Sequence, residues 1–246
     1  MYSWKRSWSV GGVILAAASF AQAAPVLIDD FNVAQTTDRQ NVGSTTNSVS
    51  DAGILGTHRD VTVTVTVASA SDPDALVTVG PENLQSSTAS GVQGRFAVVW
   101  DGSATVSGDP VTGLPSVFAL GGVDLTGGGM NDGIYIRGFA DLQPTLTVYL
   151  FEDATNYSTQ SQSFVGLNNE QLFGFLFADF IAVGAGANAA SVEAVAIVVS
   201  FETAQLAGAD VTLDFVEANF VPAPAALHGG LALLALLGVV TRRRRR

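Results

Sequence analysis

The chain contains no cysteine, and its central part contains no lysine. The absence of cysteine excludes a disulfide framework, a thiolate zinc site and a cysteine nucleophile. Seven of the 11 basic residues lie in the two ends, so four arginines face all 22 acidic residues in residues 24–219, a formal charge of −18. Such a surface repels phosphate backbones and attracts cations, which argues against nucleic acid as a partner.

Helical periodicity is also scarce in the central part of the chain. Apolar and polar residues alternate there instead, as they do in β-strands. Residues 61–67 read Val-Thr-Val-Thr-Val-Thr-Val, which predicts a half-buried antiparallel strand with valines on one face and threonines on the other. Further strands are expected at 75–79, 94–100, 133–138, 145–151, 158–164, 192–201 and 211–216. Many short strands separated by turn signals predict a single all-β domain over residues 24–219, a two-sheet antiparallel β-sandwich of jelly-roll type. Residues 170–183 are ambiguous and could contain a helical turn within 172–180.

The N-terminal 23 residues have the features of a secretory signal peptide. Lys5 and Arg6 precede an apolar stretch at 10–20, and Ala21-Gln22-Ala23 forms an A-x-A cleavage site. We therefore expect signal peptidase to cut after Ala23. The mature protein is then an exported one.

The C-terminal residues 220–246 carry a second apolar stretch. Residues 225–240 are 16 in number, and as a helix they would measure about 24 Å, slightly short of a bilayer core. Clustered cations are retained on the cytoplasmic side of a membrane, so the arginines behind this stretch predict a transient membrane helix with the body facing outward. The residues that carry this prediction are Val221, Pro222, Ala223 and Pro224 ahead of the stretch, and Arg242, Arg243, Arg244, Arg245 and Arg246 behind it.

This order of a Val-Pro-Ala-Pro motif, an apolar helix and an arginine cluster resembles the PEP-CTERM class of sorting signals, in its Val-Pro-x-Pro variant. The resemblance implies an exopolysaccharide-producing Gram-negative bacterium, in which an exosortase recognises the tail in the inner membrane and processes it. The protein would then reach the cell surface or the extracellular matrix. Ala223 stands where the commonest form has glutamate, and His228 interrupts the apolar stretch.

The two edges of the body resemble the first and last strands of jelly-roll carbohydrate-binding modules. The resemblance rests on residues 26–31, Val-Leu-Ile-Asp-Asp-Phe, and residues 210–216, Asp-Val-Thr-Leu-Asp-Phe-Val. In such modules the termini pair, and acidic groups there often hold a structural calcium ion. The resemblance therefore predicts Asp29, Asp30 and Asp214 as calcium ligands. The alternative is that they are solvated carboxylates at strand ends.

Catalytic signals are few. His58 is the one histidine of the body, and no G-x-S-x-G elbow presents a serine to it, so we expect it in a loop or at a strand entry. No carboxylate pair stands out for glycoside hydrolysis. Aromatic residues could stack on sugars or fill the core; they are Trp100, Tyr135, Tyr149, Tyr157 and the phenylalanines of 173–180. The sequence favours a non-enzymatic, exported surface or matrix protein; the alternatives are a calcium-assisted module binding exopolysaccharide and a glycoside hydrolase.

Overall fold

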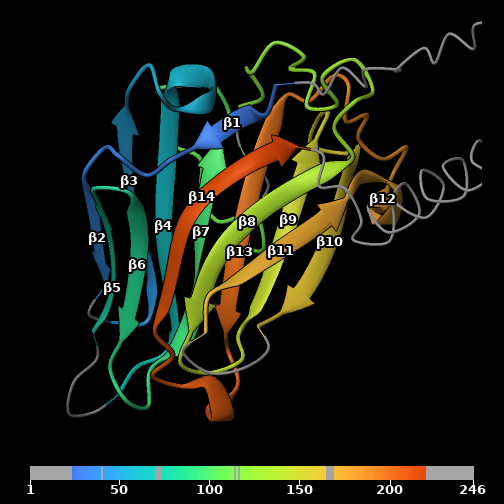
Figure 1. Cartoon of the computed structure of the whole chain (residues 1–246). Coiled ribbons are helices and arrows are strands. Elements are labelled where there is room, and N and C mark those ends of the chain that lie inside the picture. Colours follow the sequence, from blue (N-terminus) through green and yellow to red (C-terminus); the bar gives the residue numbers. More distant parts are fainter. Residues whose placement is uncertain are drawn as a thin grey trace, which may run out of the picture.

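A computed structural model describes residues 24–39, 41–69, 74–113, 115, 117–164 and 169–219 of the protein. These residues form two seven-stranded sheets that face each other, and all their strand pairs are antiparallel. Figure 1 shows one sheet in front of the other, with both described ends of the chain at the same end of the sandwich. The predicted two-sheet antiparallel sandwich is confirmed.

The front sheet, called sheet A below, contains the first and the last strand of the body. Its strands are, in spatial order, β11 (Gln171–Leu176), β8 (Gly133–Ala140), β14 (Val211–Asn219), β6 (Asn83–Thr88), β5 (Ala75–Gly80) and β2 (Gln35–Arg39), with β1 (Val26–Asp29) paired to β14. One edge of β14 pairs with β8 along its whole length. Its other edge pairs first with β6 and then with β1, which places Val26 opposite Ala218.

The rear sheet, sheet B, contains the most apolar strands. Its spatial order is β12 (Ile181–Val183), β10 (Tyr157–Ser163), β9 (Thr145–Phe151), β13 (Ala194–Phe201), β7 (Gln93–Trp100), β4 (His58–Val67) and β3 (Gly43–Ser50). Three single turns of 3-10 helix interrupt the described chain, at Leu55–Thr57, Phe177–Asp179 and Ala204–Leu206. The second of these is the helical turn expected within 172–180, and β11 and β12 flank it.

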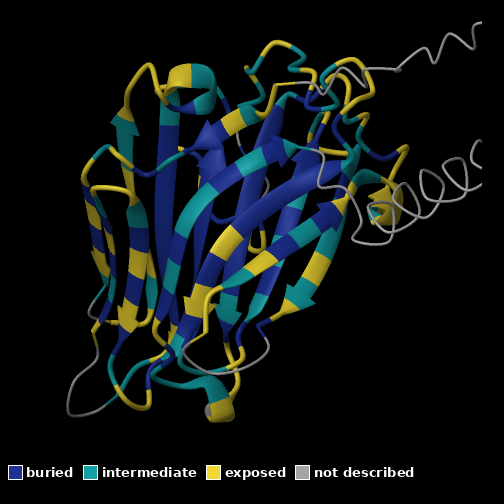
Figure 2. Ribbon diagram, viewed as in Figure 1, coloured by how far each residue is buried: buried dark blue, intermediate teal, exposed yellow. Residues whose placement is uncertain are grey.

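The core lies between the sheets and takes its residues from the inward positions of each strand. On β4 the inward positions are Val61, Val63 and Val65, all at most 1% exposed. The predicted half-burial of this strand is wrong, however, because Thr62 and Thr64 on its other face are buried as well. Residues 101–113, which follow β7, cover that outer face: Ser107 and Asp109 are hydrogen-bonded to Asp60 and Thr64 of β4. Figure 2 shows the difference: strands of the front sheet alternate between buried and exposed residues, whereas β4 is buried almost throughout.

Among the described residues, the structure contains no apolar helix of the length needed to span a bilayer. The predicted signal peptide, residues 1–23, and the predicted sorting tail, residues 220–246, lie outside the described residues. Their expected cleavage and membrane helix stay predictions from the sequence.

Candidate functional site

The predicted calcium ligands begin with Asp29, and the structure gives its carboxylate a different role. β1 does pair with β14, as predicted, but Asp29 points into the core and is fully buried. Arg59 Nη1 lies 2.9 Å from Asp29 Oδ2, and Trp100 Nε1 donates to the same oxygen at 2.9 Å. The backbone N–H of Phe31 donates to Oδ1 at 2.8 Å. Asp29 therefore neutralises a buried arginine and has little capacity left for a metal ion.

The other two predicted ligands lie in separate surroundings. Asp30 is half-buried and accepts a hydrogen bond from Asn32 Nδ2 at 2.6 Å. Asp214 lies at a bulge in β14 beside Glu170 and Arg137, where burial and the charge of Glu170 raise its pKa. Within the described ranges there is no group of three or more acidic or histidine side chains placed to hold a metal ion. The structure does not assemble Asp29, Asp30 and Asp214 into one site, and calcium binding stays a prediction.

The outer face of sheet A carries polar side chains that are open to solvent. Side chains from neighbouring strands stand in rows across it, because antiparallel partners point to the same face. In one row Phe139 on β8 is opposite Thr212 on β14, which is opposite Gln85 on β6. The row continues through Thr78 on β5 to Thr36 on β2.

Two shallow hollows lie side by side on this face. The first spans β8, β14 and β6 and is lined by Gln85, Ser86, Ser87, Phe139, Asp141, Asp210, Val211 and Thr212. The second spans β6, β5 and β2 and is lined by Asp38, Asp74, Leu76, Ser87, Thr88 and Ala89. Ser87 belongs to both, so together they form one open trough across the strands, called the sheet A trough below.

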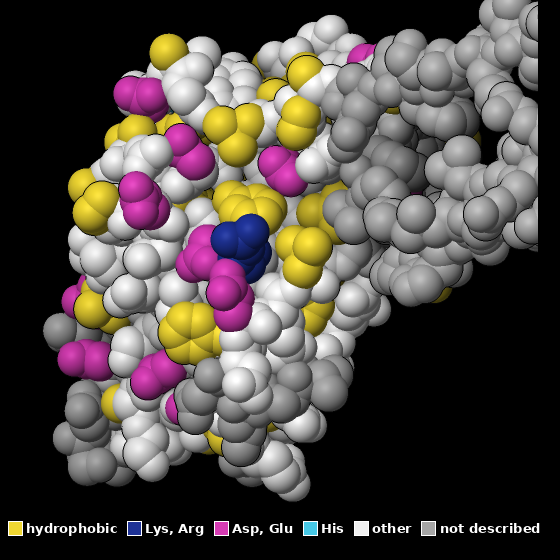
Figure 3. Space-filling view, in the orientation of Figure 1, with side chains coloured by type: hydrophobic (Ala, Val, Ile, Leu, Met, Phe, Trp, Pro, Cys, Tyr) yellow, Lys and Arg dark blue, Asp and Glu magenta, His cyan; other side chains and the backbone are white. Residues whose placement is uncertain are grey.

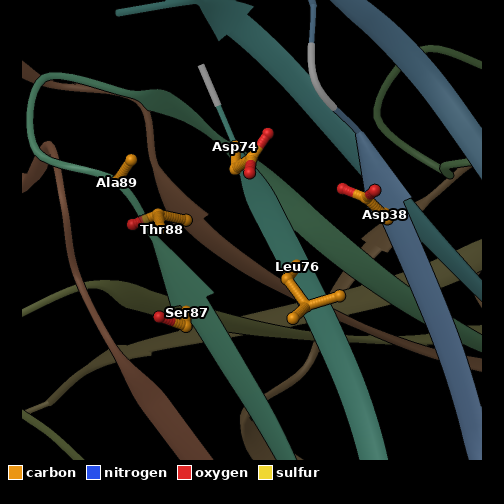
Figure 4. Close-up of a pocket in the computed structure, with 6 residues that line it drawn as sticks. All are labelled: Asp38, Asp74, Leu76, Ser87, Thr88 and Ala89. Atoms are coloured by element: carbon orange, nitrogen blue, oxygen red, sulfur yellow. The ribbon is translucent and has the colours of Figure 1, made fainter. Parts of the chain in front are cut away.

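The second hollow places two carboxylates opposite a hydroxyl-bearing strand. Figure 4 shows Asp38 on β2 and Asp74 just ahead of β5 directing their carboxylates toward the same space, with Leu76 next along β5. Ser87 and Thr88 come from the neighbouring β6. Both aspartates are exposed, so water and ligands reach them freely.

The chemistry of the trough suits a ligand rich in hydroxyl groups. Carboxylates accept hydrogen bonds, and serine, threonine and glutamine side chains both donate and accept. Phe139, 38% exposed, and Leu76 add apolar surface at separate points of the trough. An open trough that crosses several strands can hold an elongated ligand, whereas small molecules usually bind in enclosed pockets.

Beside the trough lies a charged cluster around Arg137. Its guanidinium carbon is 4.7 Å from the centre of the Phe215 ring, and its Nε is 3.2 Å from Glu170 Oε1. In Figure 3 the one dark blue patch of this face is flanked by acidic and hydrophobic side chains. Glu170 and Asp214 offset the arginine's charge, so the face as a whole stays acidic.

The aromatic residues predicted from the sequence as sugar-stacking candidates lie mostly in the interior. Trp100, Tyr135, Phe173 and Phe175 are buried. Tyr149 and Tyr157 are half-buried and pack with Phe118 and Phe151 on the outer face of sheet B. The exposed aromatic of the trough is Phe139, which was not among the predicted residues; its alternation with the buried residues of β8 was the available signal.

The outer face of sheet B is covered by residues 101–113 and carries a buried polar network. Asp60 on β4 accepts a hydrogen bond from the backbone N–H of Ser107, whose hydroxyl donates to Asp101. Asp60 Oδ1 has no hydrogen-bond partner, and burial raises the pKa of this carboxyl. His58 begins β4, as predicted, with its Nδ1 3.1 Å from Thr57 Oγ1. The strand-entry interpretation of His58 is confirmed.

No family model matches the chain, and no curated protein matches it. Among solved structures, a family 11 carbohydrate-binding module from Clostridium thermocellum in complex with a β-1,3-1,4-mixed-linked tetrasaccharide is similar over 79% of this chain and 95% of its own, with 6% identity and a TM-score of 0.37. A family 30 carbohydrate-binding module matches over 81% and 96%, with 11% identity and a TM-score of 0.36. An agarase matches over 61% of this chain and 22% of its own, with 8% identity and a TM-score of 0.40. These scores are low, so the function of the chain has to be argued from its own residues.

Proposed function

We propose that the chain is an exported, non-enzymatic surface or matrix protein whose sandwich, of jelly-roll type, binds a polysaccharide in the sheet A trough. The observation that carries the proposal is the pair of adjoining hollows that share Ser87 and run across five neighbouring strands. A bound glycan chain would lie across the strands, with its hydroxyl groups on the polar side chains and an apolar ring face on Phe139. The matches to carbohydrate-binding modules suggested the ligand class to test.

The second hollow of the trough contains a carboxylate pair but lacks the surroundings that glycoside hydrolysis requires. A hydrolase needs one carboxyl group that stays protonated near neutral pH, which enzymes achieve by placing it in an apolar environment. Asp38 and Asp74 are both exposed to solvent. We therefore assign them to binding, as acceptors for sugar hydroxyls, and not to acid–base chemistry.

The export half of the proposal rests on the sequence of the two ends. A signal peptide of residues 1–23 and a tail with the Val-Pro-Ala-Pro motif and five terminal arginines together predict delivery to the membrane and recognition there by an exosortase. Export without disulfides is compatible with this body, because a domain of about 200 residues can bury a sizeable core unaided.

Binding is tested by affinity electrophoresis of the mature protein against a panel of soluble polysaccharides, including mixed-linked glucan, galactan and an exopolysaccharide from a producing bacterium. Phe139→Ala should weaken retardation about tenfold, since loss of one stacking ring costs roughly 1–1.5 kcal/mol. Val67→Ala removes another exposed apolar side chain, 44% exposed on sheet B, and should leave retardation unchanged. Retardation by none of the panel, or an equal loss in both variants, would contradict binding in the trough.

Export and sorting are tested by the intact mass of the protein from its native host. Loss of the first 23 residues together with the tail beyond about Val221 would support sorting by an exosortase. A protein that keeps its terminal arginines would contradict processing of the tail.

A further inference from the structure

Four aspartates line the sheet A trough, and none of the described residues that line it is basic. Asp141 follows β8 and Asp210 precedes β14, and the backbone N–H of Asp210 donates to Asp141 Oδ1 at 2.8 Å. Asp38 and Asp74 line the second hollow, where their carboxylates are directed toward the same space (Figure 4). Each of the two hollows therefore contains a pair of carboxylates.

The two pairs lie at opposite ends of one row of side chains across the strands. Ser87 on β6 is opposite Leu76 on β5, and Leu76 is opposite Asp38 on β2. On the other side of Ser87, the backbone N–H of Thr88 donates to Asp210 Oδ1 at 3.2 Å. Because neighbouring strands are about 4.8 Å apart, Asp38 and Asp210, three strands apart, are separated by about 14 Å.

No described side chain forms an ion pair with these aspartates. The ion pairs among the described residues involve Asp29, Asp109, Glu202 and Glu170 as their acidic members. Arg39 directly follows Asp38, but its guanidinium donates to backbone carbonyls of residues 41 and 42, both at 2.7 Å. Like charges side by side on neighbouring strands repel each other, so the trough in its free state has a negative charge that a cationic ligand would neutralise.

The spacing of the carboxylates fits several positive charges along one ligand better than a single metal ion. A metal ion needs several oxygen ligands at one point, and the described residues contain no group of three acidic or histidine side chains that could hold one. Two pairs about 14 Å apart can instead bind two ammonium groups of an elongated chain. A carboxylate accepts a hydrogen bond more strongly from an ammonium group than from a neutral hydroxyl.

We propose that the polysaccharide bound in the trough is an amino-sugar polymer with free, protonated amino groups. The aspartates bind the amines, the hydroxyl and amide side chains of the neighbouring row bind sugar hydroxyls, and Phe139 contacts a ring face. This inference rests on the proposed function, since it names the ligand class of the same trough. It also predicts that polymers of uronic acids are not bound, because their carboxylates would face those of the trough.

The test compares two soluble oligomers that differ only in the amine: a glucosamine hexamer and its fully N-acetylated form. Isothermal titration calorimetry of the mature protein at about pH 5.5, where the amines are protonated, should give a Kd about tenfold lower for the amine form. Equal affinity for the two hexamers, or no binding of the amine form, would overturn the inference. The proposed function fails with it only if the polysaccharides of the retardation panel are not bound either.

Matched variants assign the effect to the trough. Asp38→Asn/Asp74→Asn removes two charges from the trough, and Glu152→Gln/Asp179→Asn removes two from exposed positions outside it. The trough variant should lose about fivefold in affinity for the amine hexamer at low salt and keep its affinity for the N-acetylated form, because two exposed ion pairs are lost. The control variant should bind both hexamers as the parent protein does. Equal losses in the two variants would overturn the proposal, because they would assign the binding to the negative charge of the whole body.

Discussion

The two outer faces of the sandwich differ in what covers their polar side chains. On sheet A, threonine, glutamine and aspartate side chains stand open to solvent and line the trough. On sheet B, the corresponding polar residues of β4 are buried beneath residues 101–113, and Asp60 and Thr64 are hydrogen-bonded to this segment. The composition of the strands does not distinguish the faces, because both alternate apolar and hydroxyl-bearing residues.

The difference shows that a polar strand face can have two roles, one in stability and one in binding. Buried, its polar groups need partners, and their hydrogen bonds fix the covering loop in place. Exposed, the same groups are hydrogen-bonded to water and are available to exchange it for a ligand. Substitutions on sheet B should therefore change stability, and substitutions on sheet A should change binding.

The largest effect is expected at Arg95, which holds the cover of sheet B in place. Arg95 Nε donates to Asp109 Oδ2, and Arg95 Nη1 pairs with Glu202 Oε1. Asp109 is 3% exposed, so Arg95→Ala leaves a buried carboxylate without its cation, which costs about 3–5 kcal/mol. Urea unfolding followed by circular dichroism measures the loss. A cost below about 1 kcal/mol would show that the covering loop is not held by this pair.

A matched pair of threonines compares the two faces directly. Thr64 on β4 donates to Asp109 Oδ2 at 3.1 Å and lies 2.9 Å from Ser44 Oγ, whereas Thr78 on β5 is exposed. Thr64→Val should destabilise by about 1–2 kcal/mol, because it leaves buried partners unsatisfied. Thr78→Val should stay within about 0.5 kcal/mol of the parent protein. Equal urea midpoints for the two variants would remove the distinction between the faces.

The buried carboxyl of Asp60 makes the stability of the covered face of sheet B depend on pH. Its pKa lies above the ordinary 3.8 because burial disfavours the charged form and Asp101 repels it; Ser107, Ser48 and His58 act in the opposite direction. The folded state then binds more protons than the unfolded state, so this group's contribution to stability falls as pH rises from 3.8 through the raised pKa. Asp60→Asn should raise the melting temperature at pH 7 by about 3 °C and leave it unchanged below pH 3.8. A lower melting temperature at pH 7 would show that the charge is satisfied.

The smallest effect is expected at the exposed ion pair of sheet A. Arg137 and Glu170 are 47% and 57% exposed in their side chains, and such pairs contribute little to stability. Glu170→Gln should change the free energy of unfolding by less than about 0.5 kcal/mol, since the contact of Arg137 with Phe215 remains. A loss comparable to that of Arg95→Ala would make the exposed cluster a structural element.

The sequence predicted most strands that carry apolar alternation, and also the polar β10, but it missed the polar strands β2, β3 and β6 and left β11 ambiguous. β4, β7, β9 and β13 were found from their valines, leucines and aromatics. β3, with the sequence Gly-Ser-Thr-Thr-Asn-Ser-Val-Ser, has no apolar period because it is an edge strand with few buried positions. Cross-strand hydroxyl contacts hold it instead, such as Thr46 Oγ1 to Thr62 Oγ1 at 2.8 Å. Such hydroxyl contacts can be predicted only when the pairing of β3 with β4 is already known.

The site was less predictable than the fold. The pairing of the first and last strands was foreseen, yet the orientation of Asp29 was not, because a β-bulge between Leu27 and Asp29 turns this carboxylate toward the core. Its partner Arg59 is 30 residues away in sequence. The trough depends on side chains from β8, β14, β6, β5 and β2, and their alignment follows from strand order, which alternation alone does not reveal.

The central position of β14 also affects how the body resists a pulling force. Any tension applied through the residues that follow Asn219 acts along this strand, which is hydrogen-bonded to β8 on one edge and to β6 and β1 on the other. Such a force acts parallel to the strand and shears these ladders, so all of their hydrogen bonds bear the force together. A force that peels off an edge strand would instead break its hydrogen bonds one after another. Resistance to force is governed by the rate of unfolding. A body held by this end would therefore resist unfolding under flow.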